Sequence, residues 1–245
     1  MDKVNNQHAA IVPQLSVDCV VFGFHAGNLK VLLLRWKATD LWSLPGGVIY
    51  QNESLDEAAH RVLQERTGLD KIYLRQFHAF GDMGRYDKQF LVDRLGHVID
   101  PDLWFDRTVS IGYFALVDYE AVHPNPDAFT DECRWWDLHD VKELLFDHCN
   151  ILQVALRHLQ LELSFQPIGI NLLPEKFTMP EMLRLYESVL GKVIDPRNFQ
   201  KKILKSGVVI KLAEVKKGTA HKRPFLYKFD LPRYKELVRE GGLFF

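Results

Sequence analysis

Three charged residues and a glycine stand at fixed spacing around the start of a predicted helix. Gly47 is followed after five residues by Glu53, after seven more by Arg61, and then by Glu65. Side chains three or four positions apart lie on one face of a helix, and hard divalent cations prefer oxygen ligands. A helix with carboxylates at this spacing can therefore hold a metal ion against a phosphate.

The elements that must position these residues can be predicted from the surrounding sequence. A Leu44–Gly47 segment with proline and two glycines leads into the helix, for which Ser54 is the expected N-cap and Gly68 the expected C-terminal stop. The helix predicted for Ser54–Arg66 carries apolar residues at helical spacing, namely Leu55, Ala58, Ala59, Val62 and Leu63.

This loop and helix resemble the Nudix box, and the preceding Trp42–Gly46 segment matches the usual approach to that box. In the family, three carboxylates on the helix hold Mg²⁺ against a pyrophosphate. The matching positions here are Val62, Glu65 and Arg66. Because one carboxylate of three remains and a cation replaces another, the resemblance implies weak or absent metal-dependent hydrolysis, no catalytic residue and no required metal.

The same resemblance indicates that the ligand pocket was kept. Glu53 and Arg61 match a pair that braces the loop against the helix in the family. Arg66 has two interpretations, a surface arginine paired with Glu65 or a neighbour, or a direct contact to a ligand's phosphate or hydroxyls. Three further pocket candidates follow from position in the fold, each with a core or surface role as the alternative. The effector-binding residues expected are Arg35, Trp42, Gly47, Glu53, Arg61, Glu65, Arg66 and Phe80.

The second region with chemistry of its own is a basic stretch near the C-terminus. Pro196–Lys235 holds twelve basic residues against two acidic ones, whereas the whole chain has a formal net charge of −1. Such asymmetry favours a polyanion partner. In the helix predicted after Asp195, Phe199 and Ile203 face a core and leave a basic and amide face that suits a DNA major groove. The predicted DNA-binding residues are Arg197, Asn198, Gln200, Lys201, Lys202 and Lys205, with Lys222 and Arg223 on a basic turn.

The apolar pattern along the chain predicts two domains. The first begins with a hairpin of Val17–Phe24 and Leu29–Leu34 and continues with mixed strands and helices up to a largely helical Val141–Leu163. The polar stretch Gly81–Arg107 is too long for an ordinary connection and is expected to be a lid or an extended hairpin, or simply an excursion. In the second domain, two helices, the first capped by Thr178, precede a basic hairpin.

The two domains together resemble the Nudix-related transcriptional regulators of bacteria. The resemblance implies an α+β fold, a Nudix α/β/α sandwich followed by a winged helix-turn-helix. We expect a flexible N-terminus at 1–14, an effector-binding domain at 15–165, a linker at 166–174 and a DNA-binding domain at 175–245. Members bind a double-stranded DNA operator as homodimers and sense ADP-ribose or a pentose sugar, so the same partners are expected here.

Other classes are excluded or kept as alternatives. No apolar run is long enough for a membrane span and the start does not resemble a signal peptide, so a cytoplasmic protein without a membrane partner is expected. The three cysteines lack a metal or disulfide spacing. The main alternative is an active Mg²⁺-dependent hydrolase of ADP-ribose or a related nucleoside diphosphate derivative, with Asp82 or Asp87 completing the metal site. A less favoured alternative is an RNA-binding or scaffold protein.

Overall fold

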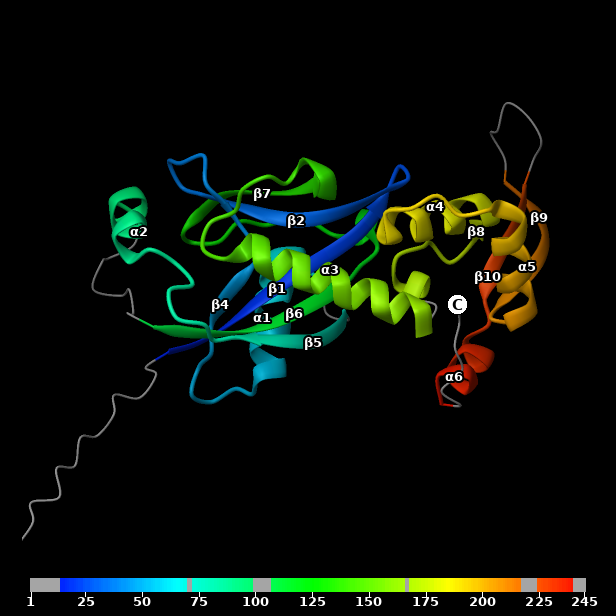
Figure 1. The fold of residues 1–245 in the computed structure, drawn as a ribbon, viewed down its shortest axis with the longest axis horizontal. Helices are drawn as coiled ribbons and strands as arrows, with labels where there is room; N and C mark the ends of the chain where they lie inside the picture. The colour runs from blue at the N-terminus through cyan, green and yellow to red at the C-terminus, as the bar shows by residue number, and fades with distance from the viewer. Residues whose placement is uncertain (1–13, 70–71, 99–106, 166–167, 217–223, 240–245) are drawn as a thin grey trace, which may run out of the picture.

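The computed structural model describes residues 14–69, 72–98, 107–165, 168–216 and 224–239. It consists of an N-terminal domain built on a large mixed sheet and a C-terminal domain at one end of it (Figure 1). Gln14, which the sequence placed in the flexible N-terminus, is the first residue of a strand and pairs with Thr108. The rest of that extension, 1–13, lies outside the described residues.

The large sheet has seven strands in the order β3-β2-β1-β6-β5, with β4 on β1 and β7 on β2. β1 and β6 are parallel, and the other pairs are antiparallel. The predicted hairpin is confirmed, because β1 and β2 are joined by Ala26 and Gly27, both with positive φ. The strands are β1 (Gln14–His25), β2 (Asn28–Trp36), β3 (Trp42–Ser43), β4 (Gly46–Val48), β5 (Tyr73–Phe80), β6 (Thr108–Leu116) and β7 (Thr130–Asp137).

Two helices, α1 (Leu55–Thr67) and α3 (His148–Phe165), cover opposite faces of this sheet (Figure 1). Alternate residues of β1 serve the two faces, because side chains along a strand point alternately up and down. Cys19 and Val21 pack in the cluster that contains the buried side of α1, whereas Val20 and Phe22 pack in the cluster that contains α3. The expected α/β/α sandwich is confirmed. Short 3₁₀ turns lie at Tyr119–Ala121 and Leu138–Asp140.

Two predictions in this domain need correction. The helix expected from Val141 begins only at His148, because Phe146 has a φ of 57°, which is incompatible with a continuous right-handed helix. The stretch 81–107 is not an extended hairpin in its described part, since Asp87 caps a helix, α2 (Lys88–Leu95). Two leucines of α2 pack against the turn before α3 and against β2, in a small cluster of Leu91, Leu95, Leu145, Trp36, Leu41, Tyr86 and Phe146.

The C-terminal domain has the predicted order of helix, helix and hairpin. Phe199 and Ile203 are buried, and Tyr186 packs edge-on against Phe199. A helix after the last strand was not predicted. The elements are η4 (Ile168–Asn171), β8 (Phe177–Thr178), α4 (Met179–Leu190), α5 (Pro196–Ser206), β9 (Val209–Val215), β10 (Phe225–Phe229) and α6 (Leu231–Arg239), with the sheet order β8-β10-β9. The tip of the basic hairpin, 217–223, lies outside the described residues.

The two domains are joined by a continuous apolar core and by polar contacts through α4. The Leu29 backbone N–H donates to Ser188 Oγ at 2.7 Å, and Gln160 Nε2 donates to the Val189 carbonyl at 2.9 Å. Both donors belong to elements of the N-terminal domain, β2 and α3. Within the described residues, no helix combines the length and apolar character needed to cross a bilayer.

Candidate ligand cavity and basic helix

The box helix α1 is fixed at both ends by local contacts. Ser54 Oγ accepts a hydrogen bond from the Glu57 backbone N–H, and Glu57 Oε2 accepts one from the Ser54 N–H at 2.8 Å, which forms a capping box. Gly68 ends the helix with a φ of 71°, a left-handed conformation that favours glycine. Val62 is buried beneath the helix, so the charged residues at 61, 65 and 66 are carried by a rigid element.

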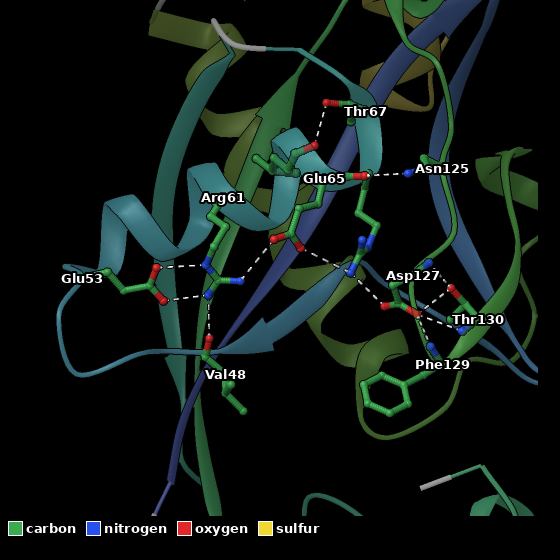
Figure 2. A network of polar contacts seen from close by, with 11 residues as sticks. Val48, Glu53, Arg61, Glu65, Thr67, Asn125, Asp127, Phe129 and Thr130 are labelled. Carbon is green, nitrogen blue, oxygen red and sulfur yellow. Dashed lines mark hydrogen bonds and ion pairs between the residues drawn. The ribbon is translucent and has the colours of Figure 1, made fainter.

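Glu53 and Arg61 form the brace that the sequence predicted. The Arg61 guanidinium donates to both carboxylate oxygens of Glu53, at 2.9 and 2.6 Å, and to the Val48 carbonyl at 2.9 Å (Figure 2). The hydrogen bonds from Arg61 and from the Tyr50 backbone N–H lower the pKa of Glu53 to about 2. The loop after β4 is thereby tied to α1.

Arg66 is buried and pairs with a residue that is far away in the sequence. Its side chain is 9% exposed, and its Nη2 donates to Asp127 Oδ2 at 2.8 Å. The other Asp127 oxygen accepts from the backbone N–H groups of Phe129 and Thr130, each at 2.8 Å (Figure 2). The interpretation of Arg66 as a surface residue is therefore wrong. Asp127 was missed because it lies 61 residues further along the chain, although an aspartate three residues before a threonine is typical of a turn.

A cavity of about 600 Å³ opens between the box helix and the sheet. Four of the predicted effector residues line it, Gly47, Arg61, Glu65 and Arg66. Glu53 does not line it but holds Arg61 in place. The volume falls within the range of about 300–1,000 Å³ that is typical of small-molecule sites.

The structure places the other three predicted effector residues outside this cavity. Arg35 pairs with Asp131 at 2.8 Å on the surface, and Trp42 packs edge-on against Trp136. Phe80 is buried in the core beneath α3. Arg35 and Trp42 lie on β2 and β3, whose neighbouring residues Leu34, Trp36 and Ser43 line the cavity, and side-chain alternation turns both away from it. Phe80 lies on β5, from which no residue lines the cavity.

The inner wall of the cavity is a buried polar cluster that sequence reasoning did not find. Asp18 Oδ2 accepts a hydrogen bond from Ser110 Oγ at 2.5 Å, and Oδ1 lies 3.4 Å from His148 Nε2. The Arg85 guanidinium donates to both oxygens of Asp147, at 2.8 and 2.7 Å, and lies 3.7 Å from Asp18. Arg85 comes from the segment before α2, so that segment contributes to the cavity wall.

The charge and proton positions in this cluster follow from its contacts. Burial opposes the charged form, yet His148, Ser110 and Arg85 hold the pKa of Asp18 below its ordinary value. The Leu44 backbone N–H donates to His148 Nδ1 at 2.9 Å, so this nitrogen is an acceptor and the ring proton is on Nε2, facing Asp18. With both nitrogens engaged, His148 is built to hold Asp18 rather than to accept a proton from a substrate. A lone aspartate in an apolar strand was the available sequence indication.

Aromatic rings form another part of the cavity lining. Trp36 stacks with Phe129 at a centroid distance of 6.4 Å and lies edge-on to Phe146 at 6.1 Å. Tyr50 and Phe129 are 52% and 42% exposed. The Arg61 guanidinium covers one face of Tyr50 at 4.2 Å from the ring centroid, and Phe129 stacks on Trp36, so the other exposed ring surface of each is available to a flat ligand group. The cavity therefore combines charged groups with surfaces on which a nucleobase can stack.

The box helix does not fit Mg²⁺. Of its three family metal positions, Val62 offers no oxygen and Arg66 offers a cation, so Glu65 is the one carboxylate there. Asp82 and Asp87, the carboxylates considered for a hydrolase, do not line the cavity, and Asp87 caps α2 instead. In the part of the chain that the structure describes, no three His, Cys, Asp or Glu side chains gather as metal ligands.

The predicted DNA-binding residues lie together on α5. Asp195 caps this helix by accepting from the Asn198 backbone N–H at 2.8 Å, and Phe199 and Ile203 anchor its inner face. The outer face is exposed at every predicted position, namely Arg197, Asn198, Gln200, Lys201, Lys202 and Lys205. Lys222 and Arg223 lie outside the described residues.

Comparisons with known proteins agree with both domains. Residues 12–164 match the model of the NUDIX domain family, and residues 169–229 match that of the NrtR DNA-binding winged helix domain. The ADPR responsive transcriptional repressor NtrR of Acinetobacter baylyi is 31% identical over 230 residues, which cover 91% of this chain and 84% of the relative.

Solved structures show the same two-domain arrangement. Shewanella oneidensis NrtR complexed with a 27mer DNA has a TM-score of 0.70 at 26% identity, over 90% of this chain and 95% of that one. A second structure of Shewanella oneidensis NrtR has a TM-score of 0.69 at 28% identity, over 89% of this chain and 94% of that one. The chain therefore belongs to the Nudix-related transcriptional regulators of the NrtR type, in which a Nudix domain precedes a DNA-binding winged helix.

Proposed function

We propose that this protein is a transcriptional regulator that binds duplex DNA through α5 and binds ADP-ribose or a closely related nucleotide in the cavity without hydrolysing it. The observation that carries the proposal is the ion pair of Arg66 with Asp127 at 2.8 Å. It places a neutralised guanidinium where the family's metal carboxylates stand. The pocket thus offers hydrogen-bond donors for a phosphate and requires no metal cofactor.

ADP-ribose is favoured over a pentose as the effector by the size and lining of the cavity. A free pentose fills only part of about 600 Å³ and has no flat group to stack on Tyr50 or Phe129. The similarity to an ADPR responsive repressor supports the same choice. A site that binds such a ligand in the folded state alone is stabilised by it.

The proposal includes a cytoplasmic homodimer that binds a two-fold symmetric operator, with one α5 in each half-site. Effector and DNA then compete or cooperate through the relative placement of the two winged helices. The contacts of α4 with β2 and α3 support this coupling between effector and DNA. Both elements also reach the cavity, β2 through Trp36 and α3 through His148, so they connect the cavity to the DNA-binding domain.

A thermal-shift experiment in EDTA tests the effector assignment. ADP-ribose at about 100 times its Kd adds about 2.7 kcal/mol, which raises the Tm of a protein of this size by roughly 5–10 °C. NAD and several pentoses at equal concentration are the comparison ligands, with smaller shifts expected. A shift with a pentose and none with ADP-ribose would replace the nucleotide with a sugar in the proposal.

A further inference from the structure

Glu65 occupies an unusual position between two guanidinium groups. Its Oε1 lies 3.8 Å from Arg61 Nη1 (Figure 2), and its Oε2 lies 3.7 Å from Arg66 Nη2. Both distances exceed the range of a hydrogen bond. The two arginines therefore converge on one carboxylate that neither of them holds by a direct hydrogen bond.

The firm contacts of both arginines lie elsewhere. Arg61 is fixed by Glu53 at 2.6 Å, and Arg66 by Asp127 at 2.8 Å. The Glu65 side chain is 47% exposed, whereas that of Arg66 is 9% exposed. Ion pairs at exposed positions contribute little to stability, because solvent screens them. Glu65 can therefore leave this position at small cost, and the two guanidinium groups would stay where they are.

The local charge balance also disfavours a second anion while Glu65 is in place. The carboxylates of Glu53, Asp127 and Glu65 outnumber the guanidinium groups of Arg61 and Arg66. If Glu65 rotates away, the remaining charges balance and N–H groups of both arginines are open to the cavity. Guanidinium groups bind phosphate through such paired N–H donors.

We propose that Arg61 and Arg66 form a phosphate subsite of the cavity that Glu65 occupies in the free protein, and that a phosphate of the effector displaces Glu65 without a metal ion. The inference rests on the proposed function, since it assigns the subsite to the diphosphate of a nucleotide effector. In this proposal Glu65 competes with the phosphate of the effector instead of coordinating a metal ion.

The test is the affinity of Glu65→Gln for ADP-ribose, measured by calorimetry in EDTA. Loss of the competing charge should tighten binding about three- to tenfold. Glu175→Gln is the matched control, because it removes the same charge from an exposed residue that does not line the cavity, and its affinity should equal that of the wild type. Adenosine, which has no phosphate, should bind the wild type and Glu65→Gln equally.

Weaker binding of ADP-ribose by Glu65→Gln, or wild-type binding that requires Mg²⁺, would overturn the inference and assign Glu65 to a metal. Inorganic pyrophosphate is the second probe. It distinguishes a failure of the phosphate subsite from a failure of ADP-ribose as the effector. Tighter pyrophosphate binding by Glu65→Gln supports the subsite even where ADP-ribose does not bind the wild type. Equal pyrophosphate binding together with equal ADP-ribose binding removes the subsite. An unchanged Tm of the free variant confirms that it is folded.

Discussion

The cavity and helix α5 both carry clustered cations, but the cations are held in different ways. In the cavity, Arg61, Arg66 and Arg85 each contact a carboxylate at 2.6–2.8 Å. On α5, Lys201 and Lys205 are exposed and have no carboxylate partner among the residues that the structure describes. The paired arginines are fixed before a ligand arrives, whereas Lys201 and Lys205 are available to an external polyanion.

This difference separates two kinds of recognition. Fixed guanidinium groups present N–H donors in one geometry, which suits a small ligand of defined shape. Unpaired lysines on a helix attract phosphates at longer range and release counterions on binding, so their contribution depends on salt. We therefore expect cavity substitutions to change stability and ligand affinity, and α5 substitutions to change DNA binding alone.

The largest expected effect is on the free energy of unfolding of Arg85→Ala. The Arg85 side chain is 6% exposed, and its loss leaves Asp147 and Asp18 without their cation. Breaking such a buried pair costs about 3–5 kcal/mol. Arg35→Ala removes an arginine that is 37% exposed, so its loss of stability should be much smaller, because solvent screens exposed ion pairs. Urea denaturation measures both variants. An equal decrease in the free energy of unfolding for Arg85→Ala and Arg35→Ala would contradict the distinction between buried and surface ion pairs.

The next effect concerns sequence preference in DNA. Arg197→Ala removes a side chain able to read a guanine edge and should relax selection at one operator position, by about 1–3 kcal/mol. Binding-site selection from a random duplex library measures it, with the wild type selected in parallel. An identical selected profile would place base readout on another face of the winged helix.

A smaller effect is expected for Lys201→Ala, which should weaken binding to all duplexes to a similar degree. For a phosphate contact, the slope of log affinity against log salt concentration falls by about one. The free energy of unfolding should not change, because Lys201 is exposed. A salt titration by fluorescence anisotropy gives the slope, and an unchanged slope would show that Lys201 does not contact DNA.

The smallest effect is a dependence of stability on acid pH. Hydrogen bonds from Arg61 and Tyr50 lower the pKa of Glu53 from 4.5 to about 2 in the folded state. A lowered folded-state pKa stabilises above the unfolded value, and this stabilisation is lost as pH falls from about 4.5 to 2. Glu53→Gln should show a shallower decline in this range. Some decline should remain, since the pKa of Asp18 is also lowered.

Local patterns allowed much of the fold to be predicted. The helix α1 was predicted from Ser54 and Gly68, and the helix α4 from Thr178, because each cap depends on residues adjacent in sequence. The start of α3 was not predicted, since the left-handed Phe146 interrupts an apolar pattern that otherwise continues as a helix. The helix α2 was also missed, because its two buried leucines, Leu91 and Leu95, pack on partners far away in the sequence.

The site was predictable in its box residues and not in its other half. Gly47, Arg61, Glu65 and Arg66 share one segment whose spacing is diagnostic. Asp18, Arg85, Asp127 and His148 come from four separate segments, and only the folded sheet brings them to one cavity. We assigned three residues to the cavity from their positions on strands alone, namely Arg35, Trp42 and Phe80. That reasoning fails because the face of the sheet to which a side chain points determines whether it can line the cavity.

The most direct test of a sensing pocket is an operator-binding titration with and without ADP-ribose in EDTA, followed by chromatography of the recovered nucleotide. The expected result is that ADP-ribose changes DNA affinity without added metal and is recovered intact. A change in affinity that needs Mg²⁺, accompanied by cleavage of the nucleotide that Glu65→Gln abolishes, would contradict it.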